Sequence, residues 1–476
     1  MTAKKDKLKI LFLEPETGSR YNYIPMGLAY LSSYIKKHCA IPVETIIVRH
    51  SENEIDQILA YNSDIIGITA MTHNYNTANI IAERIKSIVP NQNIILGGQH
   101  ITSAPDSLFP SFNCAIAGEG EAAFLQYVNA FIDSEEIDYS QINNLVYWKD
   151  GNIQINARLP FIDPIDSISY PDREAVNGFE NIIKSNNFGR FNRNDIRWIQ
   201  LTTSRGCPYK CKFCQPSVLW GKYRMHSAEY VADEIEYVVN KYNINAIQVE
   251  DDLFTGNKTR LIKIIELLEQ KNLLGKIVFN VAARAEQINE EWVELFQKIG
   301  IVKVELGIES GSDKVAEYLK NSKKTTQNIN LKAIVLLNKN DIAVFGSFIA
   351  GAPIEEYKDL IQSKKFMLKI KKMHKNNECS IGLATPLPGT ELWDYTIQKG
   401  LINKEDFDWN RLSTLAGIPK DLSIPVYLNE NIPIEKTVKV IKSINRRMWM
   451  GSPLDFLKAV PRRIKKIPAK IRKMLK

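Results

Sequence analysis

The sequence is poor in cysteine and in histidine, with six residues of each kind in a chain of 476. Three of the cysteines lie in one short segment, so too few remain for a disulfide framework, and we expect a reducing, cytoplasmic environment. The first residues, MTAKKDKLKILFLEP, lack the long apolar run of a signal peptide or a transmembrane helix and pass directly into a predicted strand. The composition therefore predicts a globular protein with neither disulfide bonds nor a membrane span.

The three clustered cysteines are Cys207, Cys211 and Cys214, in the segment SRGCPYKCKFCQP. A zinc site would need a further Cys or His pair downstream, but the next cysteine is Cys379 and the nearest histidine is His226. Three thiolates on a four-iron cluster leave one iron open to a further ligand. The spacing therefore predicts a [4Fe-4S] cluster that these three cysteines hold and that can bind a small molecule.

The CxxxCxxC spacing, with Phe213 just before the third cysteine, resembles the cluster loop of the radical S-adenosylmethionine (SAM) enzymes. This resemblance implies that SAM chelates the open iron. It also implies that an electron from the cluster cleaves SAM to a 5′-deoxyadenosyl radical, which abstracts hydrogen from an unreactive C–H bond. Such chemistry requires an external electron donor, which we expect to be of the flavodoxin or ferredoxin type.

The N-terminal third alternates predicted strands and helices. The strands are Lys9–Leu13, Val43–Val48, Ile65–Thr69, Ile94–Leu96 and Cys114–Ala117, and the intervening segments have helical spacing. This order predicts a Rossmann-like, doubly wound parallel sheet that binds ligands at the carboxyl ends of its strands. The residues expected at that edge are Thr69, Thr72, Gly97, Gly98, Thr102, Gly118 and Glu119.

Four phrases of this region, IPMGLAYLSSYI, DIIGITAMTHNY, IILGGQHITSAP and AIAGEGEAAF, resemble the cobalamin-binding domain that precedes many radical SAM cores. The resemblance implies that the edge residues hold cobalamin. The DxHxxG signature, whose histidine ligates cobalt in other cobalamin proteins, is absent, and His100 stands in a different context. We therefore expect no histidine on cobalt. The alternative is a Rossmann-like domain that has been repurposed and binds no cobalamin.

A second series of strands and helices begins at Trp198. The predicted strands are Trp198–Thr202, Ala246–Glu250, Val278–Ala282, Val302–Leu306, Val344–Ile349 and Ser380–Ala384. Six βα units predict a partial parallel barrel with its chemistry at the carboxyl ends of the strands. The resemblance to radical SAM cores places SAM contacts there, at Phe213, Asp251, Asp252, Arg284, Glu309, Ser310, Gly346 and Gly351.

The expected roles of these SAM contacts differ. Asp251 or Asp252 would hold the ammonium group or orient the substrate, and Arg284 would bind the carboxylate. Glu309 would accept hydrogen bonds from the ribose hydroxyl groups, and Ser310 would contact other polar groups. Gly346 and Gly351 would let the adenine lie against the backbone. No residue is assigned as catalytic.

The chain therefore divides into four expected segments. We predict a Rossmann-like cobalamin-binding domain over residues 1–135, a linker with a short hairpin over 136–195, and a radical SAM barrel over 196–400. Residues 401–476 are expected to form a helical extension with a basic, amphipathic tail. The predicted fold class is α/β throughout the two domains.

The net charge of +8 is concentrated at the C-terminus. Residues 454–476 contain nine Lys and Arg and one acid, so residues 1–453 sum to zero. Apolar residues recur in this tail at helical spacing, and the pattern predicts peripheral contact with a membrane. The alternatives are a solvated tail and a nucleic-acid arm; we expect no nucleic acid.

The leading hypothesis is a radical SAM enzyme that uses a [4Fe-4S] cluster and cobalamin to methylate an unactivated carbon. The expected substrate is a small molecule, either lipid-like or a secondary metabolite. One alternative is a radical SAM enzyme that closes or rearranges rings without methyl transfer. The other is a non-catalytic iron–sulfur protein that binds a membrane or RNA, which is disfavoured because a structural cluster prefers four protein ligands.

Overall fold

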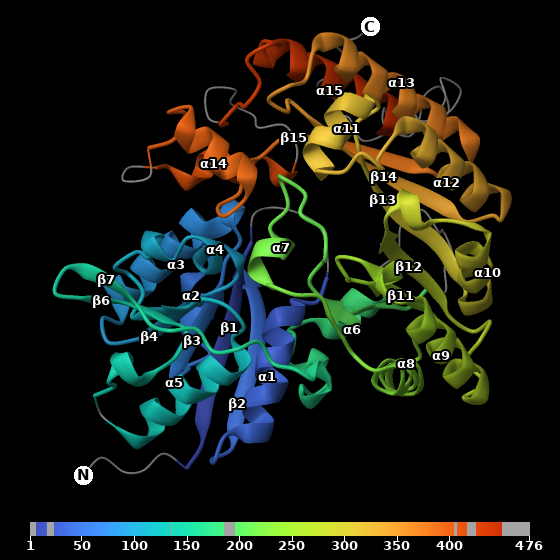
Figure 1. The fold of residues 1–476 in the computed structure, drawn as a ribbon. Helices are drawn as coiled ribbons and strands as arrows, with labels where there is room; N and C mark the ends of the chain where they lie inside the picture. The colour runs from blue at the N-terminus through green and yellow to red at the C-terminus, as the bar shows by residue number, and fades with distance from the viewer. Residues whose placement is uncertain are drawn as a thin grey trace, which may run out of the picture.

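The computed structural model describes residues 6–16, 23–134, 136–184, 196–403, 407–416 and 425–449. These residues form two sheets, each covered by helices. Figure 1 shows the N-terminal sheet and its helices, in blue to cyan, beside a larger unit of strands and helices in green to orange. Among the described residues, no helix is long and apolar enough to cross a membrane.

The first sheet has seven strands in the order β2-β1-β3-β4-β5-β6-β7. The strands are β1 (Leu8–Pro15), β2 (Val43–His50), β3 (Ile65–Thr69), β4 (Asn93–Gly97), β5 (Cys114–Ile116), β6 (Leu145–Lys149) and β7 (Asn152–Ile155). The first five in this order are parallel, which confirms the Rossmann-like prediction. Their carboxyl ends therefore meet at one edge.

Helices cover both faces of this sheet. The helices are α1 (Met26–His38), α2 (Ile55–Leu59), α3 (Tyr75–Ile88), α4 (Gln99–Ser103) and α5 (Glu121–Asp133). Side chains of a strand point to alternate faces, so Ile10 and Phe12 pack in the core with α1 and α5, whereas Leu11 and Leu13 pack with α2 and α3. Nearly every position of β1 is consequently buried.

The hairpin β6–β7 belongs to the first sheet, although the sequence placed it in a linker. Strand β6 pairs antiparallel with β5, with Val146 opposite Ala115 and Leu145 opposite Ile116. Leu145 and Val146 are both fully buried. The hairpin therefore extends the domain past residue 135, because its apolar residues complete the core at that edge.

The second sheet has six parallel strands in the order β15-β14-β13-β12-β11-β8. The strands are β8 (Trp198–Leu201), β11 (Ala246–Val249), β12 (Val278–Ala283), β13 (Ile301–Glu309), β14 (Ala343–Ala350) and β15 (Glu378–Leu383). Within the described ranges β8 and β15 do not pair with each other, so the barrel is partial, as predicted. A short antiparallel pair, β9 (Ser204–Arg205) and β10 (Arg224–Met225), follows β8.

Helices surround the outside of the barrel. They are α8 (Ala228–Tyr242), α9 (Lys258–Gln270), α10 (Glu290–Ile299), α11 (Asp313–Lys320), α12 (Gln327–Lys339) and α13 (Tyr357–Met373). The shorter helices α6 (Phe179–Ile183) and α7 (Pro216–Leu219) flank β8 on its two sides in the sequence. Each long helix buries one face, as expected for a helix that packs on a sheet.

Helix α14 (Glu391–Gln398) follows β15, and the C-terminal extension contains α15 (Ile434–Trp449). Helix α15 packs against α13 and β15, and Figure 1 shows the two helices together at the top of the molecule. Trp409 reaches the N-terminal domain, where its ring meets that of His100 edge-on at 4.4 Å between centroids. The basic tail over residues 454–476 lies outside the described residues.

Candidate active site between the two sheets

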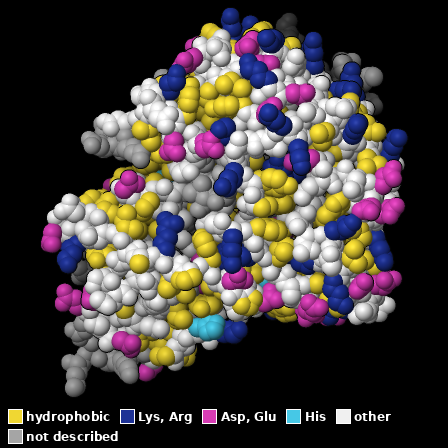
Figure 2. Space-filling model, viewed as in Figure 1, with side chains coloured by type: hydrophobic (Ala, Val, Ile, Leu, Met, Phe, Trp, Pro, Cys, Tyr) yellow, Lys and Arg dark blue, Asp and Glu magenta, His cyan; other side chains and the backbone are white. Residues whose placement is uncertain are grey.

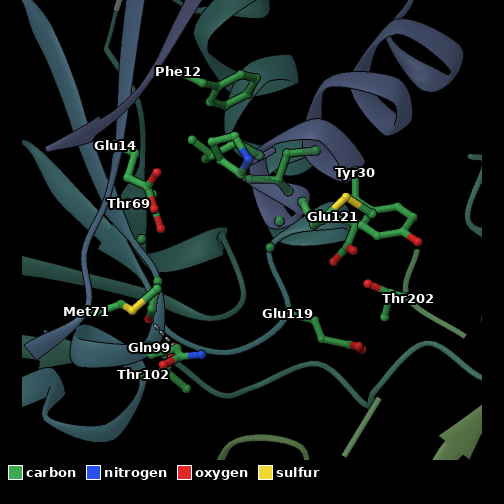
Figure 3. A pocket seen from close by; sticks show the side chains of 18 of the residues that line it. Phe12, Glu14, Tyr30, Thr69, Met71, Gln99, Thr102, Glu119, Glu121 and Thr202 are labelled. Carbon is green, nitrogen blue, oxygen red and sulfur yellow. Dashed lines mark hydrogen bonds between the residues drawn. The ribbon is translucent and has the colours of Figure 1, made fainter. Parts of the chain in front are cut away.

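A cavity of about 730 Å³ lies between the carboxyl edge of the first sheet and strands β8 and β11 of the second. Figure 3 shows Glu14, Thr69 and Thr102 on the side of the first sheet, with Tyr30 and Thr202 across the open space. The two halves of the chain therefore share one cavity, and each half lines it with the ends of its strands.

Two strands of the barrel present rows of side chains to this cavity. Trp198, Gln200, Thr202 and Ser204 line it from β8 and the segment that follows, and Gln248, Glu250 and Asp252 line it from β11. The spacing of two residues places each row on one face of its strand. The Gln200 side chain connects both domains, since its Oε1 accepts from Ile24 N at 2.6 Å and its Nε2 donates to Glu250 Oε1 at 3.1 Å.

Most carboxylates in the cavity wall are neutralised by neighbouring cations. Glu14 Oε2 lies 2.6 Å from Arg49 Nε, and Glu14 Oε1 accepts from the Tyr23 hydroxyl at 2.9 Å. Arg205 pairs with both Glu119 at 2.8 Å and Glu121 at 2.7 Å, and Arg224 pairs with Glu119 at 2.8 Å. These groups hold the wall together and leave no net charge there for a ligand.

Glu250 and Asp252 differ from those carboxylates. No ion pair reaches either of them in the part of the chain that the structure describes, and both side chains are exposed to the cavity. Burial raises the pKa of Glu250, and burial together with the charge of Asp251 raises the pKa of Asp252 to about 6. A cationic ligand group would relieve both carboxylates.

The cysteine loop begins directly after β9. Gly206 has φ +89°, and a Cβ there would lie 2.7 Å from the Lys222 carbonyl oxygen, so only glycine fits before Cys207. Within the loop, Cys214 N donates to the Cys211 carbonyl at 3.1 Å, and Lys212 N donates to Leu319 O at 2.9 Å. The loop is therefore anchored both internally and to the end of α11.

The three thiols lie near one another and near three candidate SAM contacts. Burial raises the pKa of each cysteine, and the other thiols of the loop raise the pKa of Cys207 and Cys214 further. Three thiolates on one loop can ligate three different irons of a cubane cluster.

Arg284, which directly follows β12, lies beside this loop. Its Nη1 donates to Cys211 Sγ at 3.5 Å, its Nε lies 2.5 Å from Glu286 Oε1, and its guanidinium stacks 3.7 Å above the Tyr209 ring. Its Nη2 is buried without a hydrogen-bond partner among the described residues. An unpaired buried donor is costly, so a ligand group that accepts a hydrogen bond would relieve this atom. The carboxylate of SAM is such a group.

Glu309 ends β13 in an unusual backbone conformation. Its φ is +62°, and the pairing of β13 with β14 shifts register between Gly307 and Glu309. A non-glycine residue in this region costs about 1–3 kcal/mol, which is typical of functional sites. Burial raises the pKa of Glu309, whereas Lys320 and Arg284 lower it. The irregularity therefore turns a carboxylate toward the cysteine loop.

The structure separates the roles of Asp251 and Asp252. Asp251 is buried and accepts four hydrogen bonds, from the backbone N–H and the hydroxyl of Thr203 and of Ser204, at 2.6 to 3.0 Å. It thus fixes the segment before the cysteines and has no face toward a ligand. Asp252 points into the cavity and remains the candidate for the SAM ammonium group.

Four other residues predicted as SAM contacts lie away from open space. Ser310 is 1% exposed and bonds to Ser363 Oγ and Ser312 N. Gly346 is on the outer face of β14, where a Cβ would lie 2.9 Å from Ile308 Cδ1, and Gly351 N bonds to Glu355. Phe213 packs against the core cluster that contains Trp393. These four residues do not line the cavity, and their contacts with SAM stay predictions.

Six of the seven residues predicted to contact cobalamin line the cavity: Thr69, Gly97, Gly98, Thr102, Gly118 and Glu119. Gly98 has φ +101°, and a Cβ there would lie 2.6 Å from the Ala70 carbonyl oxygen. Beside it, a Cβ on Gly97 would meet no atom within 4 Å. The Gly97-Gly98 backbone thus forms an open cradle that a bulky cofactor fits.

The seventh residue, Thr72, does not line the cavity, because its hydroxyl bonds to the buried ring of His100 at 3.1 Å. The other His100 nitrogen bonds to Ser107 Oγ at 3.1 Å, and the ring stacks on Tyr75 at 3.8 Å. Burial lowers the pKa of His100 to about 3. Both ring nitrogens are therefore engaged within the protein.

The sequence prediction missed several residues of the cavity wall. Gln200, Gln248 and Arg205 were not singled out, although all three line the cavity. For the two glutamines a signal was present, because they lie two residues before other lining positions on predicted strands. Arg205 carried no such signal, since its partners Glu119 and Glu121 are more than 80 residues away in the sequence.

Two family models match the chain. The radical SAM superfamily matches residues 201–367, and the B12 binding domain matches residues 18–128. The first range contains the cysteine loop, Asp252, Arg284 and Glu309, and the second contains the Gly97-Gly98 cradle. The two matches thus fall on the two sides of the cavity.

Characterised and named relatives extend over most of the chain. A protein named uncharacterised methyltransferase from Pyrococcus horikoshii is 29% identical over 425 residues, which cover 87% of this chain and 88% of that protein. An anaerobic magnesium-protoporphyrin IX monomethyl ester cyclase from Cereibacter sphaeroides is 27% identical over 463 residues, with coverage of 94% and 72%.

Solved structures share the fold. The radical SAM methyltransferase TsrM from Kitasatospora setae aligns with a TM-score of 0.70 and 16% identity, over 94% of this chain and 89% of that chain. The cobalamin-dependent SAM radical enzyme OxsB aligns with a TM-score of 0.66 and 20% identity, over 89% and 64%. The chain therefore belongs to the cobalamin-dependent radical SAM enzymes, whose cofactors are a [4Fe-4S] cluster, SAM and cobalamin.

Proposed function

We propose that this enzyme transfers a methyl group to an unactivated carbon of a small molecule. The observation that carries this proposal is the shared cavity, which the edge of the B12-binding domain and the strand ends beside the cysteine loop line together. Asp252, the candidate for the SAM ammonium group, and the edge residues predicted to contact cobalamin thereby line one space. A substrate in that space can contact both.

The residues that would hold each cofactor follow from their positions. Cys207, Cys211 and Cys214 would ligate the cluster, and Asp252, Arg284 and Glu309 would bind the ammonium, carboxylate and ribose groups of SAM. For cobalamin, the candidates are Thr69, Gly97, Gly98, Thr102 and Gly118. When bound, the cluster and SAM supply a radical that removes hydrogen, and cobalamin supplies the methyl group.

The cavity wall supports a substrate with an apolar body and groups that donate hydrogen bonds. Trp198, Leu219 and Trp220 provide apolar surface, whereas Gln200 and Glu250 offer polar atoms at the barrel side. A lipid-like molecule or a secondary metabolite with hydroxyl or amino groups meets this description. An anionic substrate does not, because the unpaired carboxylates of the wall would repel it.

The second candidate is ring formation or rearrangement without methyl transfer. The similarity to a protein named as a cyclase, which covers 94% of this chain, favours it specifically. The same cavity and the same SAM contacts would serve that reaction. The two candidates differ in whether the product gains a carbon atom.

We further propose where the enzyme acts and what it needs. A flavodoxin or ferredoxin type protein would supply electrons to the cluster. The enzyme would work in the cytoplasm, and the tail over residues 454–476 would hold it on the inner face of the membrane. The charge of that tail and its apolar spacing support this location.

The test of the function compares a deletion strain with the same strain carrying the gene, both fed methionine with a deuterated methyl group. We expect one metabolite to accumulate in the deletion strain and its partner, one deuterated methyl group heavier, to appear on complementation. A pair with equal carbon content and two fewer hydrogens would support the cyclase candidate instead. An unchanged metabolite profile would contradict both.

A further inference from the structure

Three helices form one outer layer of the barrel. Helix α13 packs against α12 on one side and against α15 on the other, and the layer lies on strands β14 and β15. Lys364 Nζ of α13 bonds to Ser443 Oγ of α15 at 2.7 Å, which ties the two helices directly. Figure 1 shows this layer at the upper right, on the far side of the barrel from the B12-binding domain.

This layer is strongly basic. The helices α12, α13 and α15 contain two, six and five Lys or Arg, thirteen in all, against two acids, Asp359 and Glu435. The net charge of the layer is therefore thirteen minus two, or +11. Asp359 is 3% exposed and bonded within the protein, so it does not offset the charge of the surface.

The cations face solvent in rows. The exposed ones are Lys332, Lys339, Lys358, Lys365, Lys369, Lys372, Lys436, Lys439, Lys442, Arg446 and Arg447. On α13 the spacing of Lys365, Lys369 and Lys372 places them on one stripe of the helix. Figure 2 shows several Lys and Arg side chains on the upper part of the molecule, with acidic and hydrophobic side chains between them.

Residues 1–453 have no net charge, but their positive and negative charges are separated in the fold. With +11 on three helices, the remainder of this part of the chain carries −11. Helices α8 and α10, on another side of the barrel, contain seven acids and two lysines. The sequence arithmetic assigned the basicity to the tail alone, whereas the folded body has a basic face of its own.

We infer that the face of α12, α13 and α15 docks the folded enzyme onto an anionic membrane surface. Each Lys or Arg near such a surface adds attraction of about 1 kcal/mol, and the separation of charge orients the molecule with this face toward the lipid. Helix α15 ends at Trp449, and in the sequence the basic tail over residues 454–476 follows soon after it. The face and the tail would therefore bind the same membrane surface.

Apolar residues distinguish a lipid surface from a nucleic acid. Tyr357 on α13 is 51% exposed and Val335 on α12 is 36% exposed, both within the basic layer. The tail adds Ile464, Ile467 and Ile471 at helical spacing. Apolar side chains gain from the membrane interface and gain nothing from a phosphate backbone. The inference concerns location and is independent of the reaction proposed above.

The test uses the full chain and vesicles of phosphatidylcholine with phosphatidylglycerol. One variant carries three substitutions, Lys365→Glu, Lys369→Glu and Lys372→Glu, and keeps the tail. We expect its vesicle partition coefficient to fall about tenfold or more. The matched control carries Lys37→Glu, Lys263→Glu and Lys298→Glu, at exposed positions of other helices. It changes the net charge by the same amount as the first variant, and we expect it to alter the partition coefficient less than about twofold.

Amide hydrogen exchange provides the second readout. We expect vesicles to protect peptides from α13 and α15 of the wild-type chain and not those from α8 and α10. Equal losses in the two triple variants, or no loss in the first, would overturn the inference, because the tail or net charge alone would then explain binding. Binding to total transfer RNA in place of vesicles, with a steep salt dependence, would also overturn it.

Discussion

Arg205 Nη1 lies 2.8 Å from Glu119 Oε1, and this ion pair joins the two domains at the wall of the shared cavity. Arg224 reaches the same carboxylate at 2.8 Å, and the backbone N–H of Ile162 donates to it at 2.8 Å. Both ions of the Arg205–Glu119 pair are 7% exposed. The position of the B12-binding domain over the barrel therefore depends on a buried network of charge.

Replacing Glu119 by Gln should destabilise the protein by about 3–5 kcal/mol, because Arg224 would remain buried without its ion-pair partner and Arg205 would keep only Glu121. Unfolding in denaturant measures the change. The control is Asp163→Asn, which breaks the exposed ion pair with Lys222 at 2.5 Å and should leave stability nearly unchanged, because water screens this pair. Similar losses in the two variants would show that the network adds nothing beyond a surface contact.

The same network predicts a pH dependence. Burial alone would raise the pKa of Glu119, but hydrogen bonds and charge from Arg224 and Arg205 lower it overall. A carboxyl group whose folded pKa is lowered stabilises the fold above its unfolded pKa of about 4.3, and that stability is lost as the pH falls through the folded value. The difference between wild type and Glu119→Gln should therefore shrink in acid.

Neighbouring aspartates should respond differently to the same substitution. Asp252→Asn should weaken SAM binding about tenfold or more with little loss of stability, because its carboxylate faces the cavity without a cation. Asp251→Asn should instead lower stability by about 1–3 kcal/mol, since it removes acceptors from Thr203 and Ser204. The measurements are equilibrium binding of SAM and unfolding in denaturant, made on both variants. The assignment would be wrong if Asp252→Asn lowered stability and Asp251→Asn weakened SAM binding.

Loss of the cluster should follow only from the three loop cysteines. A triple variant of Cys207, Cys211 and Cys214 to Ala should retain no iron or sulfide after anaerobic reconstitution. Single Ala variants of Cys39, Cys114 and Cys379 should retain the full content, because these residues lie away from the loop. If the triple variant kept its full iron and sulfide content, these three cysteines would not be the ligands of the cluster.

His100→Ala should leave the electron paramagnetic resonance spectrum of bound cobalamin unchanged. The ring is enclosed between Tyr75 and Trp409, and both of its nitrogens are bonded to hydroxyl groups. The substitution should lower stability, because it leaves a cavity in this stack. A nitrogen splitting of the cobalt signal in the wild type that disappears in the variant would show that His100 is a ligand.

The alternation of strands and helices and the cysteine loop could be predicted from the sequence, because periodicity and motif spacing are local properties. The sequence could not distinguish Asp251 from Asp252, since that depends on the hydrogen bonds that Thr203 and Ser204 offer. Nor could the sequence show which face of β14 carries Gly346, since that depends on its packing beside Ile308 and Cys379. The pair of Arg205 and Glu119 needs the packing of two domains, which no local pattern records.

The central claim is most directly tested with full-length protein that has been reconstituted anaerobically with iron, sulfide and cobalamin. The reaction would contain a chemical reductant, SAM with a deuterated methyl group, and the small-molecule extract of the deletion strain. We predict formation of 5′-deoxyadenosine together with a product that carries the deuterated methyl group on carbon. Protein with a full cluster and bound cobalamin that forms neither would contradict the account.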